Sequence, residues 1–563
     1  IFMKSQQTSS QLFDFKNLDK TSIFTIAIIF IILYLWHLGL YPLINPDEGR
    51  YAEIPREMLA NKNFITPYLN GVEYFEKPAL QYWITAFFMY IFGENEFAVR
   101  LFPALCALGG IYLTGYLATK MFNRQTGFLA SIIIGSSFLY LIIGSLNILD
   151  MAISFFITLS MVSYYQFSTT LKSKYLYIFY ASMAFGTLTK GLIAIVLTVA
   201  IIFCYCLLTK NLKLLLKSIS LIGILIFLVI CVPWFYLVCK DNPDFFYFFF
   251  IHEHFLRYLT KVHDRYQPFY FFIPCIILGI FPWTGFFISS FLSKSPKRTW
   301  YKFITNPHRH KYIYLCLWFS IIFIFYSMSD SKLVPYIVPC LMPMAILISR
   351  HLNHISYQTT KIKIALFINA FISLLIIVAL IVTAIKSDFI SLEEFIFSGS
   401  FIILVLFISN LIIFISWYKY KNFSQIIAIY AISAILFSFS LQPVITQVAQ
   451  HRTGKEIAQV VNTLKTKDTL IISYKDYLQD LPFYTKSRIA IYDYLGELEF
   501  GSKHDRGQGW FFNKEEFLST WQQNPHAILV VPQKYKQECL TELNDENAVI
   551  YFETNKYLII THN

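Results

Sequence analysis

The chain has 563 residues and a net charge of +12, and 56% of its residues are hydrophobic, 18% aromatic and only 14% charged. Apolar runs of about 20 residues recur along most of it, which matches the roughly 30 Å hydrocarbon thickness of a bilayer. This composition excludes a soluble enzyme built on one buried core. The basic excess lies in short loops between apolar runs, so cytoplasmic loops facing anionic lipid explain it better than nucleic acid does.

The first predicted membrane span covers residues 21–41, and a long charged loop follows it directly. No cleavable signal pattern precedes this span, so we expect it to stay as an anchor. Between Ile44 and Pro78 the loop holds six acids, four bases and four prolines. Prolines stiffen a loop, and a long, charged, semi-regular loop is usually functional. The alternative is a solvated loop docked on the membrane surface.

Twelve further spans are predicted by length and apolar composition. They cover residues 97–119, 126–143, 147–167, 175–189, 191–209, 217–239, 269–291, 312–328, 333–349, 362–385, 398–417 and 424–442. Residues 80–93 form another apolar run that is short for a span. With the N-terminus in the cytoplasm, every strongly basic short loop is cytoplasmic only when 80–93 does not cross. We therefore predict that 80–93 is a helix at the outer interface.

The same topology collects the polar segments of interest on the outer membrane surface. These are the 44–78 loop, Asp150, Lys190, the 240–268 loop and the segment around Ser331 to Pro335, together with the region after about Val444. The sequence therefore predicts one extracytoplasmic site.

From Val444 onward the composition changes to that of a small α/β domain. Strand-like runs lie at 469–473, 489–492, 527–531, 549–552 and 557–561, with helical patterns near 455–464 and 514–521. No nucleotide-binding glycine fingerprint is present. The predicted fold is a polytopic α-helical membrane protein of about 13 transmembrane helices. It divides into a membrane domain, 1–443, with outer loops 42–96 and 240–268, and an α/β domain, 444–563.

Three carboxylates are candidate catalytic groups. Asp47 and Glu48 follow the first span, where such a pair can hold a hydroxyl, an ammonium or a metal; the alternative is a helix cap after Pro46. Asp150 stands at the margin of an apolar run, where an acid is costly and so points to function. A cap for the span that begins near Asn147 is the alternative for Asp150.

Cations and tyrosines at the same membrane surface are candidate phosphate ligands. Tyr74 and Lys77, in YFEKP, pair a hydroxyl with an ammonium at headgroup depth, although interface anchoring is common for these residue types. Lys190 lies between two apolar runs and either snorkels outward or faces a cavity. Lys332 and Tyr336 open a later span at the same surface.

The 240–268 loop carries His252, His254 and Arg257 in the stretch IHEHFLRY. Arg257 offers a planar fork for phosphate. Two histidines alone are a weak zinc signal, and Glu76 could be a further ligand only through tertiary contact. Ordinary interfacial polarity is the alternative for both histidines.

Several motifs together resemble the bacterial aminoarabinose transferase family. They are NPDEGRYAEIPREM, YFEKPALQYW, the TKG segment, HEHFLRY, SKLVPYIVP and LGELEFG (Leu495–Gly501), and they run across nearly the whole chain. The family belongs to the GT-C glycosyltransferases and is related to protein O-mannosyltransferases. The resemblance implies transfer of an amino sugar, aminoarabinose or similar, from undecaprenyl phosphate to lipid A at the periplasmic face of the inner membrane, giving resistance to cationic antimicrobial peptides.

The resemblance also implies roles for single residues. By motif, Asp47 and Asp150 resemble the two site carboxylates, and Glu48 stands beside the first. Tyr74, Lys77, Lys190, Arg257 and, from SKLVPY, Tyr336 are expected around the donor phosphate. Glu76 and His252 resemble a pair placed to hold a divalent metal such as zinc or to shape the loop. The expected partners are the lipid-linked sugar donor, lipid A and membrane lipids, with no nucleic acid.

Three alternatives stay open. A protein O-mannosyltransferase-like enzyme would use a polyprenyl-phosphate sugar and a hydroxyl acceptor, which would require Asp47 as a true base. A lipid-linked-sugar translocase would need charge on both membrane faces or a polar path through the spans, and the inner loops are merely basic. A scaffold that binds cell-wall polymer would not need acids and phosphate-binding cations gathered at one surface.

Overall fold

The computed structural model describes residues 20–256, 266–291, 306–353, 360–386, 392–420 and 423–562. Its contacts divide the chain into two compact units. The helical unit holds Ile1–Leu38, Pro103–Pro233 and Phe250–Gln447, and the mixed unit holds Gly39–Phe102, Trp234–Phe249 and Val448–Asn563. The charged first loop therefore belongs to the same compact unit as the C-terminal region.

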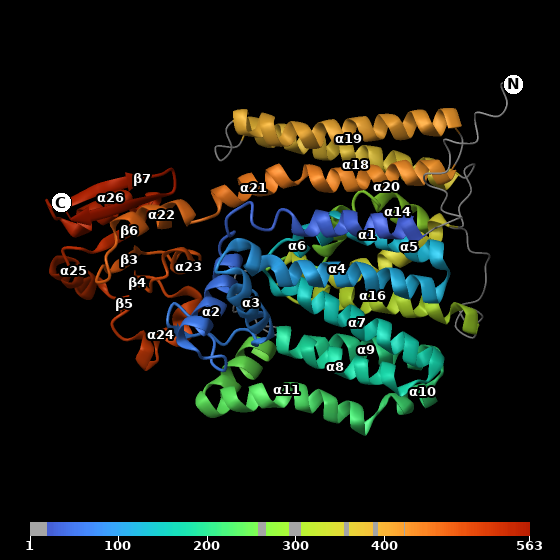
Figure 1. Ribbon diagram of the computed structural model, residues 1–563, viewed down its shortest axis with the longest axis horizontal. Helices are drawn as coiled ribbons and strands as arrows, with labels where there is room; N and C mark the ends of the chain where they lie inside the picture. The colour runs from blue at the N-terminus through green and yellow to red at the C-terminus, as the bar shows by residue number, and fades with distance from the viewer. Residues whose placement is uncertain are drawn as a thin grey trace. The chain divides into compact units, whose positions relative to one another are not determined.

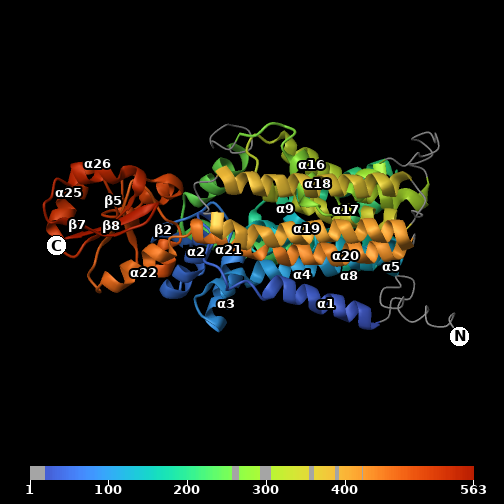
Figure 2. The same ribbon diagram turned by 90° about the horizontal axis from the view of Figure 1, so that it is seen from above.

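The helical unit is built from long apolar helices, of which α18, α19 and α20 lie side by side (Figure 1, Figure 2). Four helices, α4, α11, η1 and α21, cross the boundaries of this unit. Together with them, its helices are α1 (Lys20–Leu35), α4 (Glu96–Met121), α5 (Arg124–Gly135), α6 (Phe138–Gly144), α7 (Leu149–Thr170), α8 (Ser173–Lys190), α9 (Ile193–Leu208), α10 (Leu212–Ser218), α11 (Leu221–Asp241), η1 (Tyr247–Leu256), α13 (Phe272–Gly279), α14 (Thr284–Phe291), η2 (Pro307–Arg309), α16 (His310–Met328), η3 (Val334–Cys340), α17 (Leu341–Leu352), α18 (Thr360–Lys386), α19 (Leu392–Tyr420), α20 (Phe423–Ser440) and α21 (Gln442–His451).

Helices occupy all the segments that the sequence predicts as spans. Among the described residues, seven are long and apolar enough to cross a membrane, or nine if α5 with α6 and α13 with α14, bent by 65° and 116°, each count as one span. The sequence prediction of about 13 spans is larger. α1 and α9 have only 16 residues each, while α7 and α8 contain serine, threonine and tyrosine residues that lower their hydropathy.

The part of the mixed unit that follows the first span contains α2 (Asp47–Asn61), a hairpin of β1 (Tyr68–Leu69) and β2 (Val72–Glu73), and α3 (Leu80–Phe92). The hairpin turn is Asn70-Gly71, with both residues at positive φ (53° and 74°), the backbone that Asn-Gly turns favour. α3 confirms the predicted helix in 80–93. Its 13 residues span about 20 Å, less than the hydrocarbon thickness.

The C-terminal part of the mixed unit is a six-stranded sheet in the order β5-β4-β3-β6-β8-β7. β3, β4, β5 and β6 are parallel, while β8 runs antiparallel to both β6 and β7. The strands are β3 (Ile471–Tyr474), β4 (Ile489–Tyr492), β5 (Phe511–Phe512), β6 (Ile528–Pro532), β7 (Ala548–Glu553) and β8 (Tyr557–His562). The five predicted strands are confirmed, and β5 escapes prediction because it has only two residues.

Helices cover both faces of this sheet, with α25 and α26 on one side and α22 on the other (Figure 2). Phe517 and Trp521 of α25 and Cys539 of α26 pack on the sheet residues Ile472 and Leu529. Burial on both faces explains why the central strands are nearly continuous apolar runs. The elements between the strands are α22 (Lys455–Leu464), α23 (Leu481–Thr485), η4 (Gly496–Leu498), α24 (Glu499–Ser502), η5 (Asp505–Gly507), α25 (Lys514–Gln523), η6 (Gln533–Tyr535) and α26 (Lys536–Leu543).

Candidate functional site

An ion pair links two neighbouring helices of the helical unit. Asp150 lies in the first turn of α7 and Lys190 is the last residue of α8, and Lys190 Nζ donates to Asp150 Oδ1 over 2.5 Å. Their side chains are only 13% and 14% exposed, so the pair is largely withdrawn from water. A carboxylate suits a helix N-terminus and a cation suits a C-terminus, which explains why α7 and α8 carry these charges where they do.

Two tyrosine rings complete this cluster. The Nζ atom of Lys190 lies 4.5 Å from the centroid of the Tyr336 ring, in η3. The Tyr326 ring, in the last turn of α16, packs on Tyr336 with 5.1 Å between centroids. The ammonium of Lys190 is therefore held by a carboxylate and by an aromatic face, and it keeps donors beyond the one that Asp150 accepts.

A second cluster lies in the mixed unit around Arg50 of α2. Its Nη2 atom lies 2.5 Å from Oε2 of Glu497 in η4, and its Nη1 atom lies 3.4 Å from Oδ1 of Asp47. The guanidinium also lies 5.5 Å and 6.0 Å from the ring centroids of Tyr51 and Tyr74. Arg50 is 4% exposed whereas Asp47 is 53% exposed, so the Asp47 carboxylate remains open to solvent.

Buried polar atoms without partners gather in this cluster. The hydroxyls of Tyr74 and Tyr82 and the Nε atom of Arg50 have no hydrogen-bond partner among the described residues. Burial raises the pKa of the Tyr74 hydroxyl well above its usual value, which keeps it a proton donor. A buried group left unsatisfied costs about 1–3 kcal/mol, and native proteins usually satisfy such groups with water or a ligand.

Glu48 has a different surrounding from its neighbour Asp47. Both of its carboxylate oxygens accept hydrogen bonds from Arg100, at 2.8 Å and 2.7 Å, and Oε2 also accepts one from the backbone N–H of Ile44. Arg100 is fully buried and donates to the carbonyls of Tyr41 and Pro42 as well. These contacts fix the start of α2 on α4, so they favour a structural role for Glu48 over the predicted catalytic one.

The remaining predicted residues fall in several places. Lys77 Nζ donates to the carbonyl of Glu76 at 2.9 Å and lies 3.6 Å from its carboxylate. His252 is paired with Glu253 at 3.2 Å. Arg257 lies outside the described residues. In the part of the chain that the structure describes, no group of three or more His, Cys, Asp or Glu side chains could hold a metal ion.

Glu497 is a residue that the sequence analysis quoted, within LGELEFG, without giving it a role. Glu497 contacts the guanidinium of Arg50, although the two residues are more than 400 positions apart in the chain. The signal available in the sequence was an acidic motif in a domain otherwise read as structural. Spacing along the chain could not show that this acid returns to the first loop.

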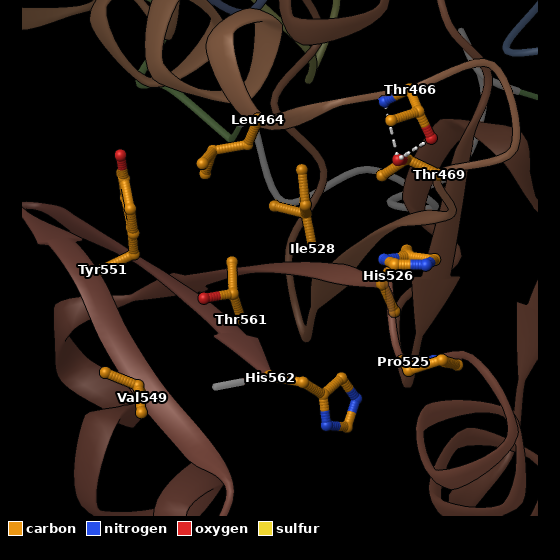
Figure 3. Close-up of a pocket in the computed structure, with 11 residues that line it drawn as sticks. Leu464, Thr466, Thr469, Pro525, His526, Ile528, Val549, Tyr551, Thr561 and His562 are labelled. Carbon is orange, nitrogen blue, oxygen red and sulfur yellow. Dashed lines mark hydrogen bonds between the residues drawn. The ribbon is translucent and has the colours of Figure 1, made fainter.

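The pocket on the sheet of the mixed unit is not part of either cluster (Figure 3). It has a volume of about 310 Å³ and is lined by residues that include His526, His562, Thr466 and Thr469. The two threonine hydroxyls bond to each other at 3.0 Å, and Nε2 of His562 lies 3.1 Å from the carbonyl of Trp521. Its polar groups are largely satisfied within the fold, and no predicted site residue lines it.

Comparison with family models gives two matches. A model described as "Dolichyl-phosphate-mannose-protein mannosyltransferase" matches residues 21–252, and a model described as "Aminoarabinose transferase C-terminal domain" matches residues 457–560.

Curated relatives are similar over long stretches. The protein named undecaprenyl phosphate-alpha-4-amino-4-deoxy-L-arabinose arabinosyl transferase in Wigglesworthia glossinidia brevipalpis is 30% identical over 96% of this chain and 97% of its own length. A Proteus mirabilis protein of that name, numbered 1, is 37% identical over 56% of each chain.

Two solved structures share the fold. The crystal structure of ArnT from Cupriavidus metallidurans bound to undecaprenyl phosphate aligns with a TM-score of 0.84 at 24% identity, covering 96% of this chain and 98% of that one. The apo structure of the same protein aligns with a TM-score of 0.82 over the same shares.

Proposed function

Because the chain belongs to the family of undecaprenyl phosphate-aminoarabinose arabinosyl transferases, we propose that it is a membrane-bound GT-C glycosyltransferase that moves an amino sugar, aminoarabinose or a close analogue, from undecaprenyl phosphate to lipid A. The observation that carries the proposal is a relative of that name aligned over nearly the full length of both chains. The Asp150–Lys190–Tyr336 cluster supplies chemistry suited to that reaction.

The reaction breaks the bond between the anomeric carbon of the sugar and a phosphate oxygen. Negative charge develops on the departing lipid phosphate, so a cation aimed at that oxygen lowers the barrier. We assign this role to Lys190, whose ammonium is held in place before substrate binds by Asp150 and Tyr336. Preorganised cations of this kind do not have to reorganise during the reaction.

The other residues that the family resemblance relates to the donor phosphate keep that proposed role. Lys77 would supply an ammonium, Arg257 a planar fork and Tyr74 a hydroxyl that burial keeps protonated. We assign Asp150 to positioning Lys190, because the short ion pair holds the carboxylate against the ammonium.

Asp47 is assigned to the sugar or the acceptor. Its half-exposed carboxylate is open to a ligand, and an amino sugar carries an ammonium that a carboxylate attracts. The hydroxyl of Tyr82, which has no hydrogen-bond partner among the described residues, would find one in a sugar oxygen. A lipid A phosphate is already ionised at neutral pH, so Asp47 orients more than it deprotonates. Direct displacement by that phosphate would invert the anomeric centre.

The metal expected at Glu76 and His252 is not used in this reaction scheme. Structural zinc sites have four ligands and catalytic sites three from protein, whereas here Glu76 contacts Lys77 and His252 contacts Glu253. The described residues alone therefore do not fit a zinc site. Metal analysis of the purified chain and of Glu76→Gln tests the expectation: a stoichiometric metal that the variant loses would restore it.

The proposed setting is the bacterial inner membrane, with about 13 crossings and the site facing the periplasm. The acid-free basic loops of the sequence support the orientation, since cytoplasmic loops carry the excess of lysine and arginine. An amino sugar placed on a lipid A phosphate offsets its negative charge, and this weakens attraction for cationic peptides. Resistance to such peptides is the expected consequence.

Protein O-mannosyl transfer is the second candidate function. The family model that matches residues 21–252 carries a mannosyltransferase description, which favours it. A hydroxyl acceptor would need Asp47 as a base, and burial raises the pKa of a carboxylate for that purpose. Asp47 is instead half exposed, which suits orientation better.

The deciding experiment is mass spectrometry of lipid A from cells with and without this chain. We expect an amino-sugar adduct on lipid A only in cells that carry the active chain, and none with an equally expressed Asp47→Asn variant. Unmodified lipid A together with new mannosylated protein would support the second candidate instead.

A further inference from the structure

Two cations share one aromatic ring at an end of the helical unit. The Nζ atom of Lys311, in the first turn of α16, lies 4.4 Å from the centroid of the Phe122 ring, just after α4. The guanidinium of Arg350, in the last turn of α17, lies 4.9 Å from the same centroid. Three helix ends therefore bring two positive charges to the same aromatic ring, and we call Lys311 and Arg350 the cation pair.

The polar contacts that the cation pair makes with other described residues leave several donors unused. Lys311 Nζ donates to the carbonyl of Met121 at 3.0 Å, and Arg350 Nε donates to the hydroxyl of Tyr312 at 3.3 Å. An ammonium has three donors and a guanidinium five. Both side chains are partly buried, so solvent satisfies the remaining donors only in part.

In the described part of the chain, no acid balances the cation pair. Among the described residues, neither Lys311 nor Arg350 forms an ion pair with a carboxylate. The described residues around the three helix ends, 120–126, 306–311 and 349–353, include no Asp or Glu. Two like charges held this close repel each other, and the repulsion grows as the surroundings exclude water. A bound anion removes that cost.

The cation pair is separate from the Asp150–Lys190 cluster. Lys311 and Tyr326 lie at opposite ends of α16, 15 residues apart, which corresponds to about 22 Å along a helix. Tyr326 packs on Tyr336, and Tyr336 packs on Lys190. The two cationic regions thus lie at opposite ends of the same helix.

The position along α16 indicates what the anion is. α16 belongs to a segment, Pro307–Met328, that is long and apolar enough to span a bilayer, and Lys311 stands at its first turn. Aromatic residues such as Phe122 and Tyr312 beside cations are typical of headgroup depth. Basic pockets between transmembrane helices bind the headgroups of anionic lipids. A soluble anion would gain the charge contact but no contact for an acyl chain.

We propose that Lys311 and Arg350 bind the phosphate group of an anionic membrane lipid, between the ends of α4, α16 and α17. The bound phosphate lies in the membrane leaflet opposite that of the Asp150–Lys190 cluster. The site is independent of sugar transfer, and none of its residues is placed in the transfer machinery.

The test uses the full chain purified in a neutral detergent and measures retained lipid by native mass spectrometry. Wild-type protein is offered phosphatidylglycerol or phosphatidylcholine, and inorganic phosphate is the competitor. We expect phosphatidylglycerol to be retained preferentially and inorganic phosphate not to displace it. Equal retention of both lipids by the wild-type protein would overturn the proposal. So would displacement of phosphatidylglycerol by inorganic phosphate at a concentration similar to that of the lipid.

The second part of the test compares two double variants, each of which removes two positive charges. Lys311→Gln with Arg350→Gln removes the cation pair, and Lys172→Gln with Lys174→Gln, at the exposed start of α8, removes two cations elsewhere. Since each Lys or Arg beside an anionic headgroup contributes about fivefold in affinity, we expect about 25-fold weaker phosphatidylglycerol retention in the first variant. An equal loss in both variants would mean that overall charge, not this site, retains the lipid.

Discussion

The Asp150–Lys190 contact shows how much a single ion pair depends on its surroundings. Exposed ion pairs contribute little to stability, but both of these side chains are about six-sevenths buried. Neither charge is well solvated without the other, so the pair acts as one unit. The role proposed for it in sugar transfer rests on that coupling.

The first prediction is that Lys190→Gln and Asp150→Asn each reduce transfer by about 10²–10³-fold, because losing a preorganised group that faces developing charge costs that much. The double variant should be hardly worse than either single one, since the two residues act together. Initial rates of transfer by purified protein check this, with exposed Lys172→Gln as the matched control. Losses that simply multiply would mean that the two residues act separately.

The second prediction contrasts two neighbouring acids of α2. Asp47→Asn should abolish most turnover and leave the thermal unfolding midpoint near that of the wild type, because Asp47 is half exposed. Glu48→Gln should lower that midpoint strongly, since breaking a buried pair costs about 3–5 kcal/mol and Arg100 is fully buried. Unfolding curves and transfer rates on both variants separate the two roles. An inactive but fully stable Glu48→Gln variant would return Glu48 to the catalytic group.

At the scale of elements, the sequence predicted most helices and strands because each carries a local signal. Long apolar runs give the helices of the helical unit, and alternating or buried apolar runs give the strands β3, β4, β6, β7 and β8. Asp150 and Lys190 were found separately, since a charge beside an apolar run is conspicuous. Their 2.5 Å contact was not predicted, because it depends on how α7 packs against α8.

The pairing of the charged residues of α2 could not be predicted from the sequence, because it depends on tertiary contacts. The pattern around Arg50 and Glu48 does not say which acid is buried or which base it meets. The sequence predicted no role for Arg100, because an arginine near the start of a span is typical of the membrane interface. Only the fold shows that it holds Glu48 and two backbone carbonyls.

The third prediction concerns α3, which we expect not to cross the membrane. Its 13 residues are short for a bilayer. Single cysteines at Asn61 and Asn95, which flank α3, should then react with a membrane-impermeant reagent from the same side, in a chain otherwise free of cysteine. A cysteine at Asn123, beyond α4, should react from the opposite side. Labelling of Asn61 and Asn95 from opposite sides would overturn the order of spans and the shared outer location of the predicted site.

The fourth prediction is a pH dependence that arises in α2. Burial, followed by the nearby Glu53 carboxylate, raises the pKa of Glu57 to about 8. Glu53 itself is held by Arg56 at 2.6 Å, so the proton resides on Glu57. A raised pKa contributes stability at low pH that is lost as pH rises through the folded value. The thermal unfolding midpoint should therefore fall between about pH 5 and about pH 8.

Glu57→Gln keeps the acceptor for the Gly71 N–H and removes the titration. We expect its unfolding midpoint to change less over the same pH range, while exposed Glu546→Gln should behave as the wild type does. Identical slopes for Glu57→Gln and the wild type would assign the pH dependence to another group.

At the scale of the whole molecule, one chain combines a helical unit typical of membrane proteins with a mixed unit that carries the first loop and the C-terminal sheet. The helical unit holds the Asp150–Lys190–Tyr336 cluster, and the mixed unit holds the Asp47–Arg50–Tyr74–Glu497 cluster. A reaction between two lipid substrates needs a membrane-embedded part for their chains and polar groups for the phosphate and the sugar. The similarity to an arabinosyl transferase covers nearly the full chain and so includes both units.

The most direct test of the central claim is transfer by the purified chain itself. Undecaprenyl phosphate aminoarabinose and lipid A are mixed with the protein in detergent, and both lipids are followed by mass spectrometry. The account predicts that lipid A gains one amino sugar as undecaprenyl phosphate appears in equal amount, and that Lys190→Gln nearly abolishes both changes. Release of undecaprenyl phosphate without modified lipid A, or no consumption of the donor by folded wild-type protein, would contradict it.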